Sequence, residues 1–301
     1  MVATQTEQFR EVVVFSGAEP KYLDFSTSHR GELRKNTKRQ EFSVHDPAGG
    51  ATYHAAYNDA PSGPSSPRHH HDFEQVRFVL SGDHEYGGKH YGAGWLGYFG
   101  EGVYYGPQAQ HGPGRSIVLQ FPGPSGGPFH SREESRRGQR EMQAAGDKFE
   151  GGICIWPDGR KQDGSDALHS WLNGRPIEYP PARYGEQVWI NTENFSWEPS
   201  GVAGVAVKHL GFFNDRGPAV QLLRLEPGAS MPAGTTGSVM IRQIYQGEVE
   251  YAGQPCPAVS GLHYPATAHY EGLSSATGAT LLSIELQAQL PGSEPPLPYR
   301  I

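Results

Sequence analysis

Two histidines separated by one residue, His69 and His71, are the clearest candidates for chemistry in this chain. They lie in the stretch GPSSPRHHHDFEQVRFVLSG, residues 63–82, which has the character of a β-strand. Successive side chains of a strand point to opposite faces, so the two imidazoles share one face with the amide of Gln75. A divalent first-row metal ion binds imidazole nitrogens at about 2.0–2.1 Å, and two neighbours at this spacing can reach one ion. The stretch therefore predicts a metal site.

The third ligand has to come from elsewhere in the chain, and His111 is the best candidate. It lies in YGPQAQHGPG, just ahead of the strand-like segment Ser116–Phe121. Gln75 is expected either to be a weak fourth ligand or to form a hydrogen bond beside the ligands. Glu74 is the alternative fourth ligand, but on a regular strand it points away from the metal, and only a β-bulge would redirect it. We therefore expect three neutral histidine ligands with Gln75 beside them.

Two more residues are expected to act on a substrate. Arg77 is on the same face as the ligands and can pair with a substrate carboxylate in a bidentate way; the alternative is a buried structural ion pair. Tyr105 is favoured over Tyr104 for the inward side, because it has the same parity as His111 if the strand is regular up to that residue. Together with Gln75, these are the expected catalytic residues. His70 is expected to be an outward polar residue.

The composition describes a turn-rich, β-rich globular chain. Its 301 residues are enough for one large or two ordinary domains, and they include 40 Gly and 25 Pro, with 19% charged residues. The net charge of −7 is spread along the chain, which argues against a nucleic-acid partner. Cys154 and Cys256 lack motif spacing and are expected to be free thiols. No apolar run is long enough to span a membrane, so we expect a cytoplasmic protein without a membrane partner.

The histidine stretch resembles a known family. The pattern G-x5-H-x-H-x3-Q-x6-G of residues 63–82 resembles the first signature of the cupin superfamily, whose usual form has Glu where this chain has Gln75. Residues 102–111 resemble the second signature, which carries the last metal histidine, although Pro107 is one residue closer to that histidine than usual. The resemblance implies an all-β fold built from cupin barrels, that is, double-stranded β-helices or jelly rolls.

The first signature recurs in the second half of the chain without its ligands. Residues 228–247 align with residues 63–82 without a gap, and they place Gly234, Thr236 and Met240 where the first copy has two histidines and a glutamine. Pro265-Ala-Thr-Ala-His269 repeats the spacing of Pro107 to His111. The chain therefore resembles a bicupin with one active and one degenerate barrel.

This repeat suggests three parts. We expect an N-terminal, metal-binding cupin barrel in residues 1–125 and a C-terminal, degenerate barrel in residues 186–301. Residues 126–185 are expected to form a connecting segment with short helices in Ser131–Phe149 and Ala167–Leu172, the second ended by Asn173-Gly174.

The function that the resemblance implies is oxygen chemistry. Three histidines and Fe(II) are similar to the site of the non-haem iron cupin dioxygenases, so we expect an Fe(II) dioxygenase or other oxygenase with O₂ and a small organic molecule as its partners. Gln75 adds no negative charge, which favours an oxygen-rich, anionic substrate that binds the metal in a bidentate way. One alternative is an isomerase, lyase or hydrolase that uses Zn, Mn or Ni as a Lewis acid. Another is a non-enzymatic binding or regulatory bicupin with a pirin-like plan. Exposed barrel edges favour a homodimer.

Overall fold

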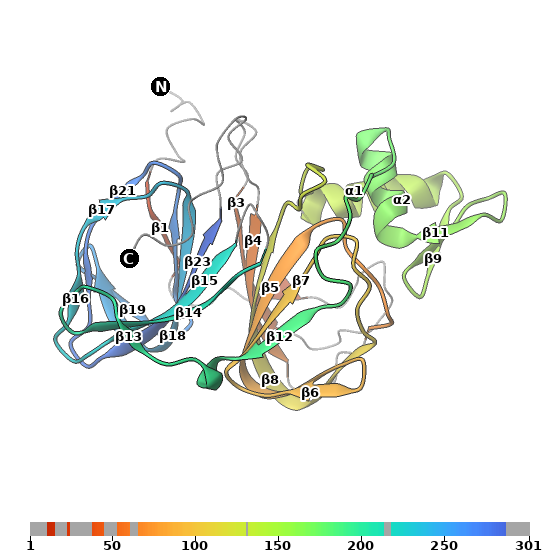
Figure 1. The fold of residues 1–301 in the computed structure, drawn as a ribbon. Helices are drawn as coiled ribbons and strands as arrows, with labels where there is room; N and C mark the ends of the chain where they lie inside the picture. The colour runs from red at the N-terminus through yellow and green to blue at the C-terminus, as the bar shows by residue number, and fades with distance from the viewer. Residues whose placement is uncertain are drawn as a thin grey trace, which may run out of the picture. The chain divides into compact units, whose positions relative to one another are not determined.

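The structure is a computed structural model that describes residues 11–15, 23–24, 38–44, 53–60, 66–130, 132–213 and 218–286. Gly63, the first residue of the signature, and the ends of the expected domains, residues 1–10 and 287–301, lie outside this part. The described residues form two compact units. We call them the N-terminal unit, which contains β2–β12 and both α-helices, and the C-terminal unit, which contains β1 and the described residues from Thr192 onward (Figure 1).

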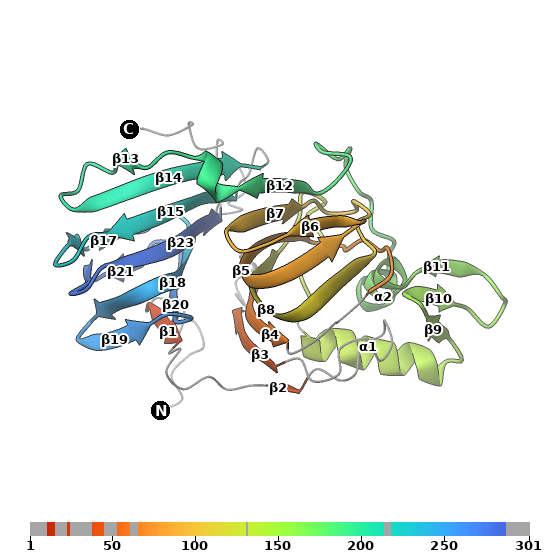
Figure 2. The same ribbon diagram turned by 90° about the horizontal axis from the view of Figure 1, so that it is seen from below.

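The N-terminal unit contains an eight-stranded antiparallel sheet in the order β12-β7-β5-β8-β4-β3-β2, with β6 paired to β5 (Figure 2). Its longest strands, β5 and β8, pair from Glu74↔Phe121 to Tyr86↔Gln108, with register shifts between Val79 and Asp83. The strands are β2 (Leu23–Asp24), β3 (Lys38–Val44), β4 (Tyr53–Ala60), β5 (Glu74–Tyr86), β6 (Lys89–Tyr91), β7 (Trp95–Phe99), β8 (Gln108–Phe121) and β12 (Val188–Asn191).

The two faces of β5 are both buried but differ in chemistry. One face carries the buried apolar side chains of Val76 and Phe78. The other carries the polar side chains of Gln75 and Arg77, which are also buried. The face of Gln75 and Arg77 packs against a cluster of aromatic residues from the end of β5 and from neighbouring segments. Alternation along one strand places the two polar side chains on one face, as the sequence predicts, and the structure surrounds them with aromatic residues. The aromatic cluster contains Tyr86, Tyr91, Phe99 and Tyr105, with Trp95 and Trp189 packed against it.

A helical insertion follows β8, as the sequence predicts. Helix α1 (Arg132–Ala144) lies within the expected range, whereas α2 (Gly164–Asn173) begins earlier than expected because the side chain of Asp163 caps it by accepting a hydrogen bond from the Ser165 amide. Gly174 ends α2 in the left-handed conformation, at φ 67°. A small sheet of β9 (Lys148–Glu150), β10 (Ile153–Ile155) and β11 (Lys161–Asp163) comes between the two helices in sequence, lies beside them in space and was not expected (Figures 1 and 2).

The C-terminal unit contains a ten-stranded sheet with the main order β1-β20-β18-β23-β15-β14-β13, and a separate pair, β17 and β21. Strand β1 joins this unit by pairing with β20, although it comes first in the chain. The strands are β1 (Val13–Phe15), β13 (Glu198–Pro199), β14 (Val205–Phe212), β15 (Ala219–Leu225), β16 (Ser230–Met231), β17 (Gly234–Thr235), β18 (Val239–Tyr251), β19 (Gln254–Pro257), β20 (Gly261–Tyr264), β21 (His269–Tyr270), β22 (Leu273–Ser274) and β23 (Ala279–Leu286), and a 3₁₀ turn, η1 (Thr192–Asn194), precedes β13.

The two units repeat one backbone feature at the aligned glycines. Gly82 in β5 has φ 88° and Gly247 in β18 has φ 77°. A Cβ atom at Gly82 would come within 2.6 Å of the Gly114 Cα atom, and a Cβ at Gly247 would collide with the backbone at Gly278. Each strand therefore needs glycine where it passes closest to its partner. This shared conformation supports the internal repeat that the sequence indicates.

Candidate metal and substrate site

His69 lies just ahead of β5, where its backbone forms an isolated antiparallel bridge with Tyr105. Its Nδ1 atom is 2.6 Å from the carbonyl oxygen of Pro67 and 3.0 Å from the Ser66 hydroxyl. A carbonyl oxygen only accepts, so this contact assigns the ring proton to Nδ1 and leaves a lone pair on Nε2. That Nε2 atom is 2.9 Å from the Tyr105 hydroxyl. His69 is therefore held in the tautomer that a metal ligand needs.

The Tyr105 hydroxyl is the point on which the predicted site residues converge. His71 Nε2 is also 2.9 Å from it, and the rings of His69 and His71 are nearly perpendicular, at 88°. Arg77 Nη2 donates to the same oxygen at 2.8 Å, and Gln75 Nε2 lies 3.4 Å away. The structure thus brings together five of the six predicted site residues.

Arg77 is a buried cation surrounded by neutral partners. Its Nη1 atom donates at 2.8 Å to both the Tyr86 hydroxyl and the Gln108 side-chain oxygen, and the Phe99 ring lies 4.6 Å from the guanidinium carbon. Burial acts to lower the pKa of Arg77, but the oxygens of Tyr105 and Tyr86 act to raise it and the net direction is upward. Among the described residues, no carboxylate contacts Arg77, so the alternative of a structural ion pair has no partner there. A buried guanidinium of this kind favours the arrival of an anion.

Gln75 is oriented by Arg77 and not toward a metal. Its Oε1 atom accepts from Arg77 Nε at 3.2 Å and from Nη2 at 2.9 Å. Because the oxygen is engaged, the amide nitrogen faces the Tyr105 hydroxyl, and an NH₂ group has no lone pair for a metal. Gln75 is therefore a hydrogen-bonding residue, the second of the two roles expected for it. Glu74 points away, as alternation predicts, and accepts from the Tyr98 hydroxyl at 2.6 Å.

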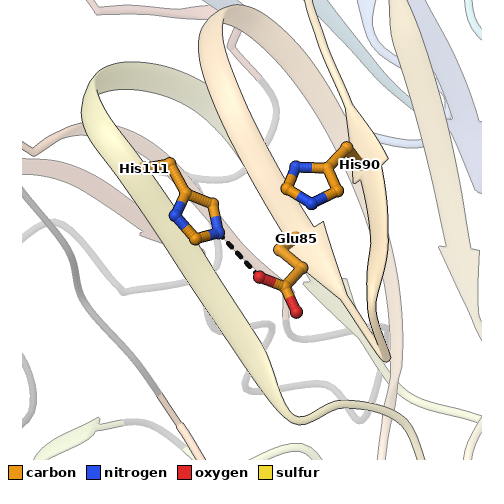
Figure 3. A group of neighbouring side chains, drawn as sticks. All are labelled: Glu85, His90 and His111. Atoms are coloured by element: carbon orange, nitrogen blue, oxygen red, sulfur yellow. Dashed lines mark hydrogen bonds and ion pairs between the residues drawn. The ribbon is translucent and has the colours of Figure 1, made fainter.

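His111 is not part of this group. It is exposed on β8, where its Nε2 atom is 2.6 Å from a carboxylate oxygen of Glu85 and its ring stacks on His90 (Figure 3). Of the groups of three His, Cys, Asp or Glu side chains that could share an ion within the described residues, none contains His69 or His71. The prediction of His111 as the third ligand is thus not supported, and Tyr105 occupies the corresponding place beside the two histidines.

The reason is a change of parity between Tyr105 and His111. Tyr105 points inward and is 2% exposed, whereas Tyr104 is 40% exposed, as expected. Strand β8 begins only at Gln108, after Gly106 takes a left-handed conformation at φ 91°. Along β8 it is then Gln110 that is buried and His111 that is exposed. Regular alternation, on which the prediction depended, does not extend across this turn.

The expectation for His70 is also wrong. His70 is not an outward polar residue but is 4% exposed, and its Nε2 atom lies 3.2 Å from Asp163 and 3.3 Å from Asp166 of the insertion. Burial lowers the pKa of His70, but the two nearby carboxylates outweigh it and raise the pKa to about 10. Close by, His169 of α2 contacts Asp72 at 2.9 Å. The insertion therefore holds the histidine segment on its outer side, a contact that local sequence patterns do not indicate.

The donors around the Tyr105 oxygen fit a divalent metal ion. Two ligands at right angles, each about 2.0–2.1 Å from an ion, lie about 2.9 Å apart. The Tyr105 oxygen is 2.9 Å from both imidazole Nε2 atoms, which matches this separation. Two imidazoles and a phenolate would form a mixed nitrogen and oxygen set of the kind that first-row metals accept.

No family model and no curated protein matches the chain. Solved structures do match it. A candidate dioxygenase from Nostoc punctiforme aligns with 97% of this chain and 88% of its own, with a TM-score of 0.63 at 11% identity. Oxalate decarboxylase from Bacillus subtilis aligns with 91% of this chain and 76% of its own, with a TM-score of 0.52 at 15% identity. The protein Ylba from E. coli covers 94% of each chain, with a TM-score of 0.56 at 7% identity.

These structures share their cupin fold with this chain. The chain is mostly β-strand with two α-helices in its described part, so the predicted all-β cupin fold is confirmed. Neither of those helices is long and apolar enough to cross a membrane.

Proposed function

We propose that the chain is a metal-dependent cupin enzyme that acts on a small, oxygen-rich, anionic organic molecule, with its site in the N-terminal unit. His69, His71 and Tyr105 would hold a divalent ion. The observation that carries the proposal is the convergence of the two imidazole nitrogens on the Tyr105 oxygen, at 2.9 Å each, beside a buried guanidinium. Bound there, the ion would supply Lewis acidity, and Fe(II) would also supply reactivity with O₂.

The residues around the ion have separate tasks. The Pro67 carbonyl fixes the ring of His69, and the Arg77 guanidinium faces the Tyr105 oxygen and would bind a carboxylate or enolate oxygen of the substrate. Gln75 keeps that guanidinium in place through two hydrogen bonds to one oxygen. The aromatic residues around it, Phe99 among them, would keep water away from the reacting groups.

Oxygenase chemistry is our preferred form of this proposal. It is supported by the shared fold of the candidate dioxygenase from Nostoc punctiforme. The shared fold of oxalate decarboxylase, whose name states a small dicarboxylate, supports an anionic substrate. At these identities the support is by analogy of fold. The alternatives are Lewis-acid chemistry with Zn, Mn or Ni and a binding function without turnover.

The metal site is tested by comparing Tyr105→Phe with Tyr104→Phe, which removes a hydroxyl from the exposed neighbour. We expect Tyr105→Phe to weaken metal binding by about 10-fold or more, because it removes a ligand, and Tyr104→Phe to leave it unchanged. Binding is measured by metal analysis and titration of protein purified without oxygen. Equal affinity in both variants would refute Tyr105 as a ligand.

The reaction class is tested by O₂ uptake with a panel of hydroxylated and dicarbonyl acids. Substrate-dependent uptake with bound iron supports an oxygenase. Turnover without O₂ demand would replace that form of the proposal with Lewis-acid chemistry, and tight ligand binding without turnover would replace it with a binding function.

The anion site is tested by Gln75→Glu, with Gln75→Met as a neutral control. A carboxylate in place of Oε1 would pair with Arg77 at about the present 2.9 Å and neutralise it. We expect the KM or Kd of an anionic substrate to rise by about 10-fold or more in Gln75→Glu relative to Gln75→Met, since one 10-fold step corresponds to a single lost charge-assisted contact. Equal values in the two variants would show that the charge of Arg77 is not used in binding.

A further inference from the structure

The strands β5, β6 and β8 place four metal-ligand side chains on one exposed face. Glu85 of β5 lies directly opposite His90 of β6, and Asp83 of β5 lies opposite His111 of β8. Cross-strand partners of this kind have Cβ atoms about 4.5–5.5 Å apart. The four residues therefore occupy neighbouring positions on three adjacent strands, fixed by the backbone.

The side chains turn toward one another across this face. His111 Nε2 lies 2.6 Å from Glu85 Oε2, and since a carboxylate accepts, this nitrogen carries a proton that a bound ion would replace. The ring centroids of His90 and His111 are 5.2 Å apart. Figure 3 shows the three side chains side by side. One ligand atom of each of Glu85, His90 and His111 lies within 4.8 Å of the others. This arrangement is already compact enough to close around one ion with small side-chain movements.

Asp83 fixes the tautomer of His90 that metal binding requires. Its two carboxylate oxygens lie 2.9 and 3.0 Å from His90 Nδ1. A carboxylate accepts, so the neutral ring carries its proton on Nδ1 and has a lone pair on Nε2. A carboxylate behind a histidine is the usual second partner of a zinc ligand, because it fixes the tautomer and the ring orientation.

We propose that Glu85, His90 and His111 form a surface site for Zn²⁺ or a similar late first-row divalent ion, with Asp83 as the partner of His90. Two imidazoles and a carboxylate are a preferred donor set for these ions. Two carboxylates and two neutral imidazoles carry two negative charges, which one divalent ion neutralises. The side chains of His90 and His111 are 55% and 49% exposed, so an ion reaches them from solvent. This site is separate from the donors around Tyr105 and does not depend on the proposed function.

The test is Zn²⁺ titration by calorimetry of the full-length protein after chelator treatment. We compare the wild type with His90→Gln, His111→Gln and, as a matched exposed control, His269→Gln. Each of the first two variants is expected to weaken one binding event by about 10-fold or more, and His269→Gln to leave it unchanged. Wild-type Zn²⁺ affinity in both His90→Gln and His111→Gln would overturn the proposal.

A second series separates the two metal sites. His71→Ala is expected to keep the surface binding event, and His71→Ala combined with His111→Gln is expected to lose it. Co²⁺ absorption in the visible range reports whether the ion is bound in a protein site of low coordination number in each variant. If Zn²⁺ binding disappears in His71→Ala alone and persists in His111→Gln, the surface site does not exist and only the site around Tyr105 binds metal. The converse result would leave the surface site standing and remove the metal from the proposed function.

Discussion

Replacing His70 by glutamine should destabilise the N-terminal unit strongly, because the imidazolium is the cation between two carboxylates of the insertion. Its Nε2 atom lies 3.2 Å from Asp163 and 3.3 Å from Asp166, and Nδ1 lies 3.1 Å from the Gly102 carbonyl oxygen. Removing one partner of a buried ion pair costs about 3–5 kcal/mol, since the remaining charges stay buried. The rise of the His70 pKa from 6.5 to about 10 sets an upper limit of about 5 kcal/mol, at about 1.4 kcal/mol for each tenfold step. We expect a loss of about 3 kcal/mol at pH 7.

The pH dependence of this loss has a definite sign. The pKa of His70 is raised in the folded protein, so its stabilising contribution is complete below pH 6.5 and is lost as the pH rises toward 10. Between these values the folded protein holds a proton that the unfolded chain has released. The free energy of unfolding of the wild type should therefore fall by up to about 1.4 kcal/mol per pH unit from this group. The difference between wild type and His70→Gln should shrink over the same range.

The assay is urea unfolding at pH 6, 8 and 9.5, followed by tryptophan fluorescence in the presence of a chelator. His90→Gln is the matched control, because it removes a histidine 2.9 Å from an aspartate on an exposed face, where such pairs contribute about 0–1 kcal/mol. The reasoning is refuted if His70→Gln costs no more than His90→Gln at pH 8. It is also refuted if the cost of His70→Gln does not decrease toward pH 9.5.

Two other predictions concern the backbone and a second buried histidine. Gly82→Ala should lower the free energy of unfolding by more than about 2 kcal/mol, because φ is 88° and the new Cβ would meet the Gly114 Cα at 2.6 Å. Gly88→Ala, at φ 78° with open space around it, should lower it by only about 1 kcal/mol. Thermal unfolding of both variants checks this, and equal losses would contradict the steric account. Burial lowers the pKa of His263 to about 4, so the protein should lose stability as the pH falls from 6.5 toward 4, by up to about 3 kcal/mol. His263→Leu should flatten that part of the profile in acid urea titrations, and an unchanged slope would assign the loss to other groups.

The part of the site that sequence reasoning could predict is the part encoded by local alternation. Gln75 and Arg77 lie on β5, where strand geometry orients their side chains to one side. His69 and His71 were expected on the same strand but precede it, and the bridge to Tyr105 holds His69. The contact of Tyr105 with this group depends on a backbone bridge to His69 across a loop. Tyr105 is inward, as predicted, but the premise of that prediction is wrong, because Tyr105 and the exposed His111 do not share a face across the turn at Gly106.

The misplacement of His111 and the role of His70 depend on long-range structure. The prediction for His111 carried alternation through Gly106 and Pro107, where the chain turns and the strand begins anew at Gln108. His70 is buried by Asp163 and Asp166, which lie more than ninety positions away in an insertion whose docking no periodicity describes. The pairing of β1 with β20 is non-local in the same way. The cupin signature thus predicted the fold, because the repeat depends on the spacing of residues close in sequence. It could not predict the long-range contacts that loops and insertions make.

Charge at the centre of the N-terminal unit narrows the class of substrate under the proposed function. Gln75 stands where the usual signature has a glutamate, so Arg77 has no carboxylate among its described contacts and keeps its positive charge. A divalent ion would add two positive charges, and Tyr105 bound as a phenolate would remove one. Two positive charges would then remain in a buried environment, where an uncompensated charge is costly. A substrate that carries two negative charges on adjacent oxygens, such as a dicarboxylate or an enolised oxo acid, would balance them by binding the ion and the guanidinium together. A monoanion would leave one charge unpaired, so we expect the site to prefer dianions.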